Sequence, residues 1–189
     1  MNRRESLKLI AGTTALISIG GGHAWAQTPP PPAGPFKLPP LGYAFDALEP
    51  HIDAQTMTFH HDRHHAANVR NANQIAQRWP ELATTPIEKI LSDLSAVPEA
   101  VRTGVRNQVG GHWNHSLFWE LMTPGGAKEP AGDLKAAIDG AFGNVATMSD
   151  KMNAAGASRF GSGWAWLVVN KDKKLDIIST ANMDTPLEL

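Results

Sequence analysis

Cysteine is absent from this 189-residue sequence. Its absence excludes disulfide bonds, zinc-thiolate sites, iron-sulfur clusters and a cysteine nucleophile, so any protein-bound metal ion must use histidine and carboxylate side chains. The sequence also lacks an excess of charge of either sign, because 17 basic residues stand against 18 acidic ones. A near-neutral chain has no broad positive surface for nucleic acid or anionic lipid, and we therefore expect a small-molecule substrate and no nucleic-acid partner.

The first 26 residues predict an export signal. Arg3-Arg4 precede an apolar stretch from Leu9 to Ile19, and Ala24-Trp25-Ala26 forms a small-x-small cleavage signal before Gln27. This order resembles a twin-arginine signal peptide, so we expect a periplasmic mature protein with no membrane attachment after cleavage. Ser6 stands where such signals usually carry a bulky apolar residue, which leaves the general secretory route open. A transmembrane anchor is the alternative, but the apolar stretch is short for a span of about 20 residues.

Composition and turn signals divide the rest of the chain into three parts. Residues 27–40 are rich in proline, which favours an extended spacer without a core. Residues 41–124 are expected to form a helical hairpin domain, which ends at the turn signal Thr123-Pro124-Gly125-Gly126. Residues 125–189 are expected to form a second domain of helices and strands. The predicted fold class is therefore α+β.

Three helices are predicted in the hairpin domain. The first begins near Asp53, a suitable N-cap, and extends to about Ala72 without proline or glycine. A short second helix carries apolar residues at helical spacing over 87–94. Pro98 suits the first turn of a third helix that runs to about Leu121.

The second domain is expected to combine two helices with an antiparallel pair of strands. Helical patterns cover residues 133–138 and 145–155, and residues 164–169 form an apolar, partly β-branched run typical of a buried strand. Residues 170–173 predict a turn, after which residues 175–180 return as a second strand. We expect this sheet to be incomplete at the end of the sequence.

Six of the eight histidines fall in the first and third predicted helices. Residues four apart share a helix face, so His60, His64 and Asn68 form one stripe. Imidazole is a good neutral ligand for iron, manganese and zinc, and one histidine from each of two packed helices can bind a single ion. The alternative is a set of surface or capped histidines without a ligand.

In the third helix, Gly111, His115 and Trp119 lie one turn apart on a common face. Two adjacent glycines, Gly110 and Gly111, weaken a helix by about 1 kcal/mol each relative to alanine, and mid-helix glycines often mark a close approach of another segment. His115 would then face a neighbouring helix or a cofactor, with Trp119 as an apolar wall. Taken alone, the tryptophans are equally explained as core residues.

Five motifs occur in the order in which they occur in one protein family, the iron/manganese superoxide dismutases, and the chain is similar to that family from about Phe36 to Leu189. These motifs are Leu48–His51, Thr58–His65, Gly110–Trp119, Ser158–Trp166 and Ser179–Asn182. The resemblance implies a helical hairpin domain followed by an α/β domain with an antiparallel sheet. It also implies conversion of superoxide to dioxygen and hydrogen peroxide by an iron or manganese ion, without indicating which of the two metals is bound.

The resemblance assigns roles by position. His60 and His115 match the first two metal ligands of the family, and His64 matches the gateway histidine that lines the substrate channel. The hydrophobic residues around the metal would be Trp119, Trp164 and Trp166. The family's remaining ligands belong to an Asp-x-Trp-Glu-His motif, which does not occur in these 189 residues.

The absence of this motif leaves three hypotheses open. The chain could be a dismutase of doubtful activity, a non-catalytic periplasmic metal-binding relic, or a gene fragment or frameshift product of a dismutase. The glutamate of the motif also bridges subunits in the family, so the resemblance leaves open whether this chain forms the family dimer. DNA downstream of the last codon would separate the fragment hypothesis from the other two.

Two features near the expected metal site differ from the family pattern: a gateway tyrosine and a glutamine. Asn68 stands at the position of the gateway tyrosine, and the only tyrosine of the chain, Tyr43, lies well upstream. A glutamine that bonds to metal-bound solvent normally comes from the position of Gly111 or of Met183. Neither residue can make that bond, because glycine has no side chain and methionine sulfur is a weak acceptor.

Overall fold

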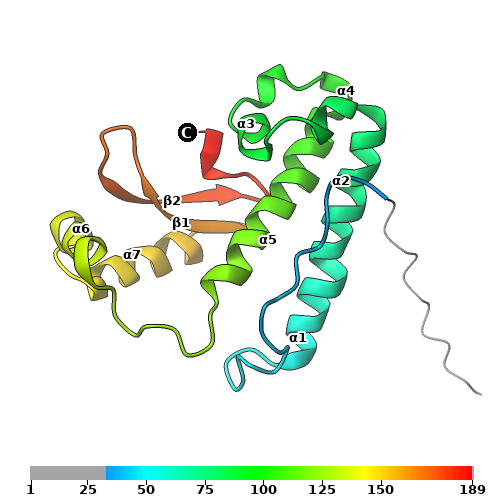
Figure 1. The fold of residues 1–189 in the computed structure, drawn as a ribbon. Coiled ribbons are helices and arrows are strands. Elements are labelled where there is room, and N and C mark those ends of the chain that lie inside the picture. The colour runs from blue at the N-terminus through cyan, green and yellow to red at the C-terminus, as the bar shows by residue number, and fades with distance from the viewer. Residues whose placement is uncertain (1–32, 189) are drawn as a thin grey trace, which may run out of the picture. The chain divides into compact units, whose positions relative to one another are not determined.

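The computed structural model describes residues 33–188. The predicted signal peptide and residues 27–32 of the predicted spacer lie outside the described residues. The predicted α+β class is confirmed, because a helical part precedes two helices and an antiparallel pair of strands (Figure 1). Within residues 33–188, no helix combines the length and apolar character needed to cross a membrane.

The histidine-bearing helix is continuous but changes its winding. It consists of α1 (Ala54–Thr58), the π-helical turn η1 (Phe59–His65) and α2 (Ala66–Arg78). Asp53 is the N-cap, as predicted, and its Oδ1 accepts a hydrogen bond from the Thr56 backbone N–H at 2.8 Å. Four of the histidines lie in the π-helical turn, a kind of element often found at functional sites.

The first helix is longer than predicted and continues past Ala72 to Arg78. Apolar side chains of this last part, including Ile75, are buried in the main core, which stabilises the additional turns. The helix ends before Trp79-Pro80, because the residue before a proline avoids helical backbone angles. A short 3-10 turn, η2 (Pro80–Ala83), follows.

The other half of the hairpin is built from short elements that lead into a long helix. They are α3 (Ile87–Leu91), η3 (Leu94–Ala96), α4 (Glu99–Gly104), the π-helical η4 (Val105–Val109) and α5 (Gly110–Leu121). The helices α2 and α5 lie side by side in Figure 1, and they are in contact. The main core between these elements consists of Ala72, Ile75, Ala76, Leu82, Ile90, Leu91, Val97, Val101, Val105 and Val109.

The last part of the proline-rich segment is held against the helices. Phe36 packs on the main core, and its backbone N–H and C=O bond with the Asn73 side chain, both at 2.9 Å. The carbonyl of Pro39 lies 2.8 Å from Nε2 of His61. The described end of the predicted spacer is therefore anchored to the hairpin.

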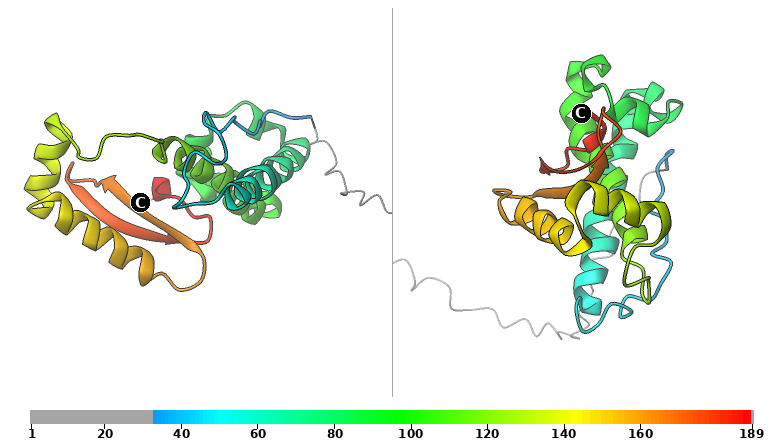
Figure 2. Two further views of the ribbon diagram at one scale, coloured as in Figure 1. Left: turned by 90° about the horizontal axis from the view of Figure 1, so that it is seen from below. Right: turned by 90° about the vertical axis from the view of Figure 1, so that its left-hand side faces the viewer.

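Beyond the hairpin, α6 (Gly132–Phe142) and α7 (Val145–Ala157) precede β1 (Gly163–Val169) and β2 (Leu175–Ala181). The strands pair antiparallel with Trp166 opposite Ile178, and η5 (Pro186–Glu188) follows them. Helices α6 and α7 pack on one side of the sheet, as Figure 2 shows. Side chains alternate across β1, so Trp164 and Trp166 point away from α7, toward α5.

Residues 164–169 form a strand, as predicted, but the prediction that this strand is buried is wrong. Only Trp166 is buried within β1, and Val169 is 68% exposed. The sheet has two strands in the described residues, so its end and part of its surface reach solvent despite the apolar sequence.

Candidate metal centre

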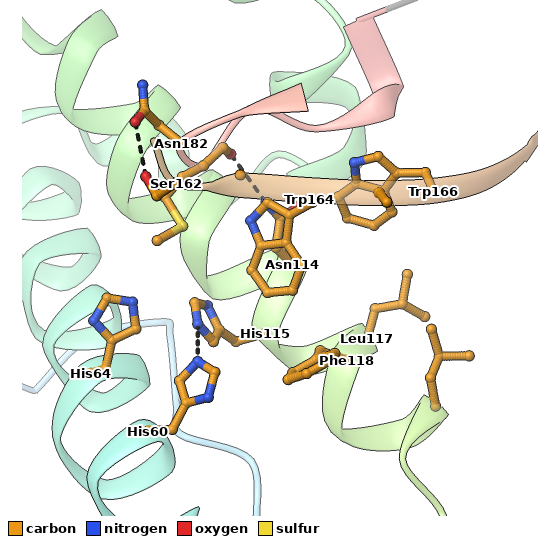
Figure 3. A pocket seen from close by; sticks show the side chains of 14 residues that line it. His60, His64, Asn114, His115, Leu117, Phe118, Ser162, Trp164, Trp166 and Asn182 are labelled. Carbon is orange, nitrogen blue, oxygen red and sulfur yellow. Dashed lines mark hydrogen bonds between the residues drawn. The ribbon is translucent and has the colours of Figure 1, made fainter. Parts of the chain in front are cut away.

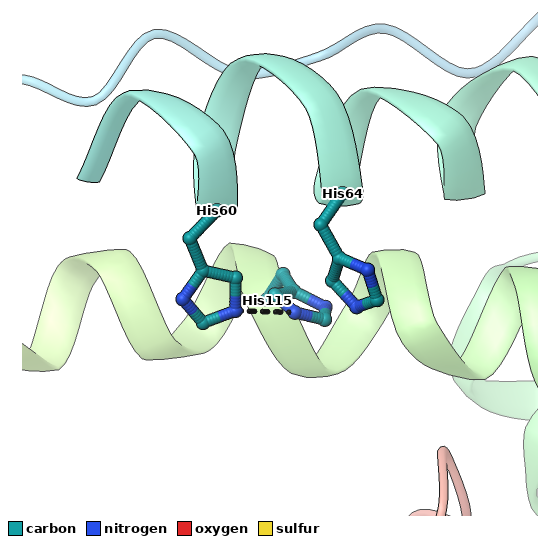
Figure 4. Close-up of side chains that lie close together, drawn as sticks. All are labelled: His60, His64 and His115. Atoms are coloured by element: carbon teal, nitrogen blue, oxygen red, sulfur yellow. Dashed lines mark hydrogen bonds between the residues drawn. The ribbon is translucent and has the colours of Figure 1, made fainter. Parts of the chain in front are cut away.

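Three imidazoles from two helices converge at one point. His60 and His64 come from η1 and His115 comes from α5, as Figure 4 shows. One ring nitrogen from each of the three lies within 4.8 Å of the other two. The Nε2 atoms of His60 and His115 are 3.0 Å apart, at hydrogen-bond distance, as the dashed line in Figure 4 marks. Two nitrogens that share an ion through bonds of about 2.1 Å at a right angle are separated by about 3 Å, so this pair fits a metal ion.

His115 is oriented by its own helix. Its Nδ1–H donates to the carbonyl oxygen of Gly111 at 2.6 Å, and only 1% of the residue is exposed. Because the proton is on Nδ1, the lone pair is on Nε2, the atom that faces His60. A hydrogen bond from the far ring nitrogen is also what fixes a metal-binding histidine in place.

The environment of His60 and His115 favours their uncharged form. Burial lowers the pKa of His115 to about 4, although the bond to Gly111 opposes part of that shift. Burial is also the main cause that lowers the pKa of His60, followed by the neighbouring His64. Neutral imidazoles at neutral pH have the free lone pairs that cation binding requires.

The three histidines open onto a cavity of about 440 Å³. Its other lining residues are Asn114, Leu117, Phe118, Leu121, Ser162, Gly163, Trp164, Ala165, Trp166, Asn182 and Met183 (Figure 3). The lining is mainly apolar, and no carboxylate belongs to it within the described residues. Its polar side chains are the three imidazoles, Asn114, Ser162 and Asn182, which lie in an otherwise mainly apolar wall.

Two of the predicted tryptophans contact the histidines directly. The Trp119 ring meets His60 edge-on, with ring centres 4.9 Å apart, and Trp164 meets His115 in the same way at 5.1 Å. Trp166 packs behind Trp164 at 5.8 Å. Trp119 is only 2% exposed and belongs to a buried apolar cluster, so the core interpretation holds for it.

The two adjacent glycines of α5 permit the close approaches that the sequence predicted. A Cβ on Gly111 would lie 2.7 Å from Nδ2 of Asn68, and a Cβ on Gly110 would lie 2.6 Å from the Met183 carbonyl oxygen. Asn68 is buried and donates to Oε1 of Gln108 at 3.2 Å. Asn68 therefore packs against Gly111 and does not belong to the cavity lining.

Met183, by contrast, lines the cavity beside the histidines. Its segment is tied to α5, because Nδ2 of Asn114 donates to the Met183 carbonyl at 3.2 Å. The following residue, Asp184, forms an ion pair with Arg106 at 2.5 Å. Position 183 thus lines the same cavity as His64 and His115.

Sequence reasoning gave no role to His65, which is 0% exposed. Its Nδ1 accepts a hydrogen bond from Nε1 of Trp119 at 2.9 Å, and its Nε2 lies 2.8 Å from Nδ1 of His112. Burial, and then the neighbouring His112, lower the pKa of His65 to about 2. Trp119 and His112 lie 54 and 47 residues beyond His65 in the sequence. The only sequence signal for these two contacts was that both segments are rich in histidine.

Comparison with known proteins agrees with this architecture. The alpha-hairpin domain of iron/manganese superoxide dismutases matches residues 35–123, and the C-terminal domain of the same family matches residues 130–189. A superoxide dismutase [Mn] of Thermus aquaticus is 55% identical over 153 residues, which are 81% of this chain and 75% of that protein. A superoxide dismutase [Mn] of Listeria innocua is 51% identical over 152 residues, 80% of this chain and 75% of the relative.

The chain belongs to the iron/manganese superoxide dismutase family. Superoxide is the substrate of this family, and iron or manganese is its metal. The histidine cluster of the present chain fits a metal ion of this kind.

Proposed function

We propose that His60 and His115 bind an iron or manganese ion and that the chain acts on superoxide in the adjoining cavity. The 3.0 Å separation of the two Nε2 atoms carries this proposal. Manganese is the metal we favour, because the similar proteins of Thermus aquaticus and Listeria innocua are named as manganese enzymes.

A bound iron or manganese ion would supply the one-electron couple needed to convert one superoxide to dioxygen and, with two protons, a second superoxide to hydrogen peroxide. His60 and His115 would hold the ion, and Trp119 and Trp164, which pack against these two rings, would shield it from bulk water. His64 is exposed and has no hydrogen-bond partner in residues 33–188, so we assign it to the solvent side of the cavity, where substrate and protons enter.

The neutral donor set leads us to propose low activity for the 189-residue chain. The cavity-lining residues provide imidazoles but no carboxylate, so a trivalent ion receives no anionic ligand from them. Turnover requires both oxidation states, and the trivalent one is the less stabilised by neutral nitrogen ligands. We expect turnover far below the diffusional ceiling of ~10⁹ M⁻¹s⁻¹ that the fastest enzymes approach. The same observation favours metal binding without catalysis as the second candidate function.

The experiment compares two proteins after loading with manganese or with iron. One is the 189-residue chain, and the other carries the family's Asp-x-Trp-Glu-His segment fused at its C-terminus. Bound metal and superoxide consumption per bound ion are measured for each. We expect metal in both and fast turnover only in the fusion. Equal rates would contradict the proposed low activity, and a chain that binds no metal would contradict the proposed site.

We also propose that the chain is exported and periplasmic. The support is the order of Arg3-Arg4, the apolar stretch 9–19 and Ala24-Trp25-Ala26. Mass spectrometry of the protein purified from a periplasmic fraction should find an N-terminus at Gln27. Recovery of an intact Met1 in the membrane fraction would contradict cleavage, and a mutant of Arg3 and Arg4 to lysine that is still exported would favour the general secretory route.

A further inference from the structure

His65 is a buried imidazole that the proposed metal chemistry does not use. Its two hydrogen bonds determine which nitrogen carries the proton. The indole Nε1–H of Trp119 can only donate, so Nδ1 of His65 must present a lone pair to it. The proton of a neutral His65 is then on Nε2, which donates to Nδ1 of His112. Trp119, His65 and His112 therefore form a directed chain of hydrogen bonds.

This chain of hydrogen bonds contacts both proposed metal ligands. The His65 ring stacks on His115, with ring centres 5.3 Å apart and planes inclined by 23°. At the other end, the Trp119 indole that His65 fixes meets His60 edge-on at 4.9 Å and 79°. A rotation of either ring would disturb the faces against which the two ligands pack.

A purely structural histidine would explain the burial of His65 but not its arrangement. The segment η1 carries four histidines, and the ring of His65 packs against both the proposed ligand His115 and the non-ligand His112. Phe36 meets His112 edge-on at 5.6 Å on the side of the proline-rich segment. The two hydrogen bonds and this ring contact together connect the anchored end of that segment to the wall of the metal site.

We propose that His65 is a positioning residue for the metal centre. Held as the neutral Nε2–H tautomer, it fixes the Trp119 indole through its Nδ1 and supports His115 by stacking, so that the Nε2 atoms of His60 and His115 stay directed at one ion. The inference rests on the proposed function, because it concerns the same two ligands. It assigns the orientation of these ligands to a residue that does not touch the ion.

Two variants of His65 separate hydrogen bonding from packing. In H65N the amide oxygen replaces Nδ1 as the acceptor for Trp119, whereas H65L fills space without accepting. W119F removes the donor and leaves His65 intact. The exposed His51 provides the control variant H51Q. Mn²⁺ affinity and the electron paramagnetic resonance spectrum of bound Mn²⁺ are measured for each variant, together with cooperative unfolding.

We expect H65L and W119F to lower Mn²⁺ affinity by about 10- to 100-fold, as loss of an outer partner of a metal ligand does, and to alter the spectrum. The double variant H65L/W119F should lose little more than either single variant, because the two residues act as one unit. H65N should restore most of the affinity, and H51Q should match the unchanged chain.

The ¹⁵N chemical shifts of the histidine rings in the metal-free chain give a second test that does not depend on how any variant folds. We expect an unprotonated Nδ1 and a protonated Nε2 for His65. The opposite tautomer would overturn the inference, as would a folded H65L with unchanged affinity and spectrum. Absence of Mn²⁺ binding by the unchanged chain would instead overturn the proposed function.

Discussion

The backbone of Gly111 lies so close to Asn68 that a Cβ at position 111 would be 2.7 Å from the Asn68 side-chain nitrogen. Asn68 stands at the position of the family's gateway tyrosine, and Gly111 is one of the two positions from which the family's glutamine can come. The structure shows that the two positions form one packing unit, because the asparagine occupies the space that a side chain at position 111 would need. A glutamine at position 111 is therefore incompatible with the present conformation of Asn68.

The contact predicts that G111A destabilises the protein. Alanine in a helix is intrinsically favoured over glycine by about 1 kcal/mol, but insertion of a methyl group into a filled space costs about 1–3 kcal/mol. We expect a net loss of about 1 kcal/mol in the free energy of unfolding, measured by urea denaturation.

The control for this prediction is the same substitution in an N68A background. Removal of the carboxamide opens the space, so G111A should there be neutral or stabilise the protein by up to about 1 kcal/mol. G110A tests the neighbouring position, where the obstacle is the Met183 backbone carbonyl and cannot be removed by a side-chain change. An equal effect of G111A in both backgrounds would show that Asn68 is not the obstacle.

The two proposed ligands predict loss of metal binding in H60Q and H115Q. Each substitution removes one of the two nitrogens that lie 3.0 Å apart, and we expect Mn²⁺ affinity to fall by more than the roughly 10- to 100-fold that an outer partner contributes. Equilibrium dialysis with metal analysis measures this. H51Q, at an exposed histidine away from the cavity, should bind as the unchanged chain does.

Much of the site could be predicted because its key contacts follow from short-range rules. Spacing of four residues on a helix placed His60 beside His64, and the Gly110-Gly111 pair signalled a close approach. The convergence of His60 with His115 needed the family resemblance, because helical spacing says nothing about which faces of two distant segments meet.

The rest depended on tertiary contacts that no local pattern encodes. The hydrogen bond between Trp119 and His65 spans 54 residues, and the one between Phe36 and Asn73 spans 37. The exposure of Val169 reflects which elements cover the sheet, although its sequence is typical of a buried strand. Successive side chains of β1 point to opposite faces of the sheet, but both faces of this strand are apolar. The sequence of β1 therefore could not show which of its side chains would be covered.

The buried histidines predict a stability that falls with acid. The pKa of His65 is lowered to about 2 and that of His115 to about 4, against an ordinary value of 6.5 for the unfolded chain. Below about pH 6.5 the unfolded state binds protons that the native state does not, so stability present above that pH is lost as the pH falls. Each group contributes up to about 1.4 kcal/mol per pH unit in this range.

Urea denaturation of the metal-free protein, with chelator present, measures this dependence at about pH 7.5, pH 6.5 and pH 5. We expect little change between the first two values and a clear loss at the third. H65N has one titrating group fewer, so its stability should depend less steeply on pH, whatever its absolute stability. A stability that rises on acidification would contradict the assignment of both histidines as neutral in the native state.

Met183 predicts a gain of function on substitution by glutamine. Its side chain lines the cavity with His64 and His115, at the position where the family resemblance implies a glutamine bonded to metal-bound solvent. Methionine has no donor and only a weak acceptor, whereas a glutamine amide can both donate and accept. The backbone at this position is already held by Asn114, so the substitution should leave the strand-to-helix contact intact.

We expect M183Q, carried in the protein fused to the Asp-x-Trp-Glu-His segment, to raise superoxide consumption per bound ion by about 10- to 100-fold and to shift the reduction potential of the bound metal. M148Q, at a half-buried methionine of α7 outside the cavity lining, is the matched control and should change neither quantity. An M183Q protein with unchanged rate and unchanged potential would show that position 183 does not reach the solvent bound to the metal, and the role implied for it by the resemblance would then be wrong.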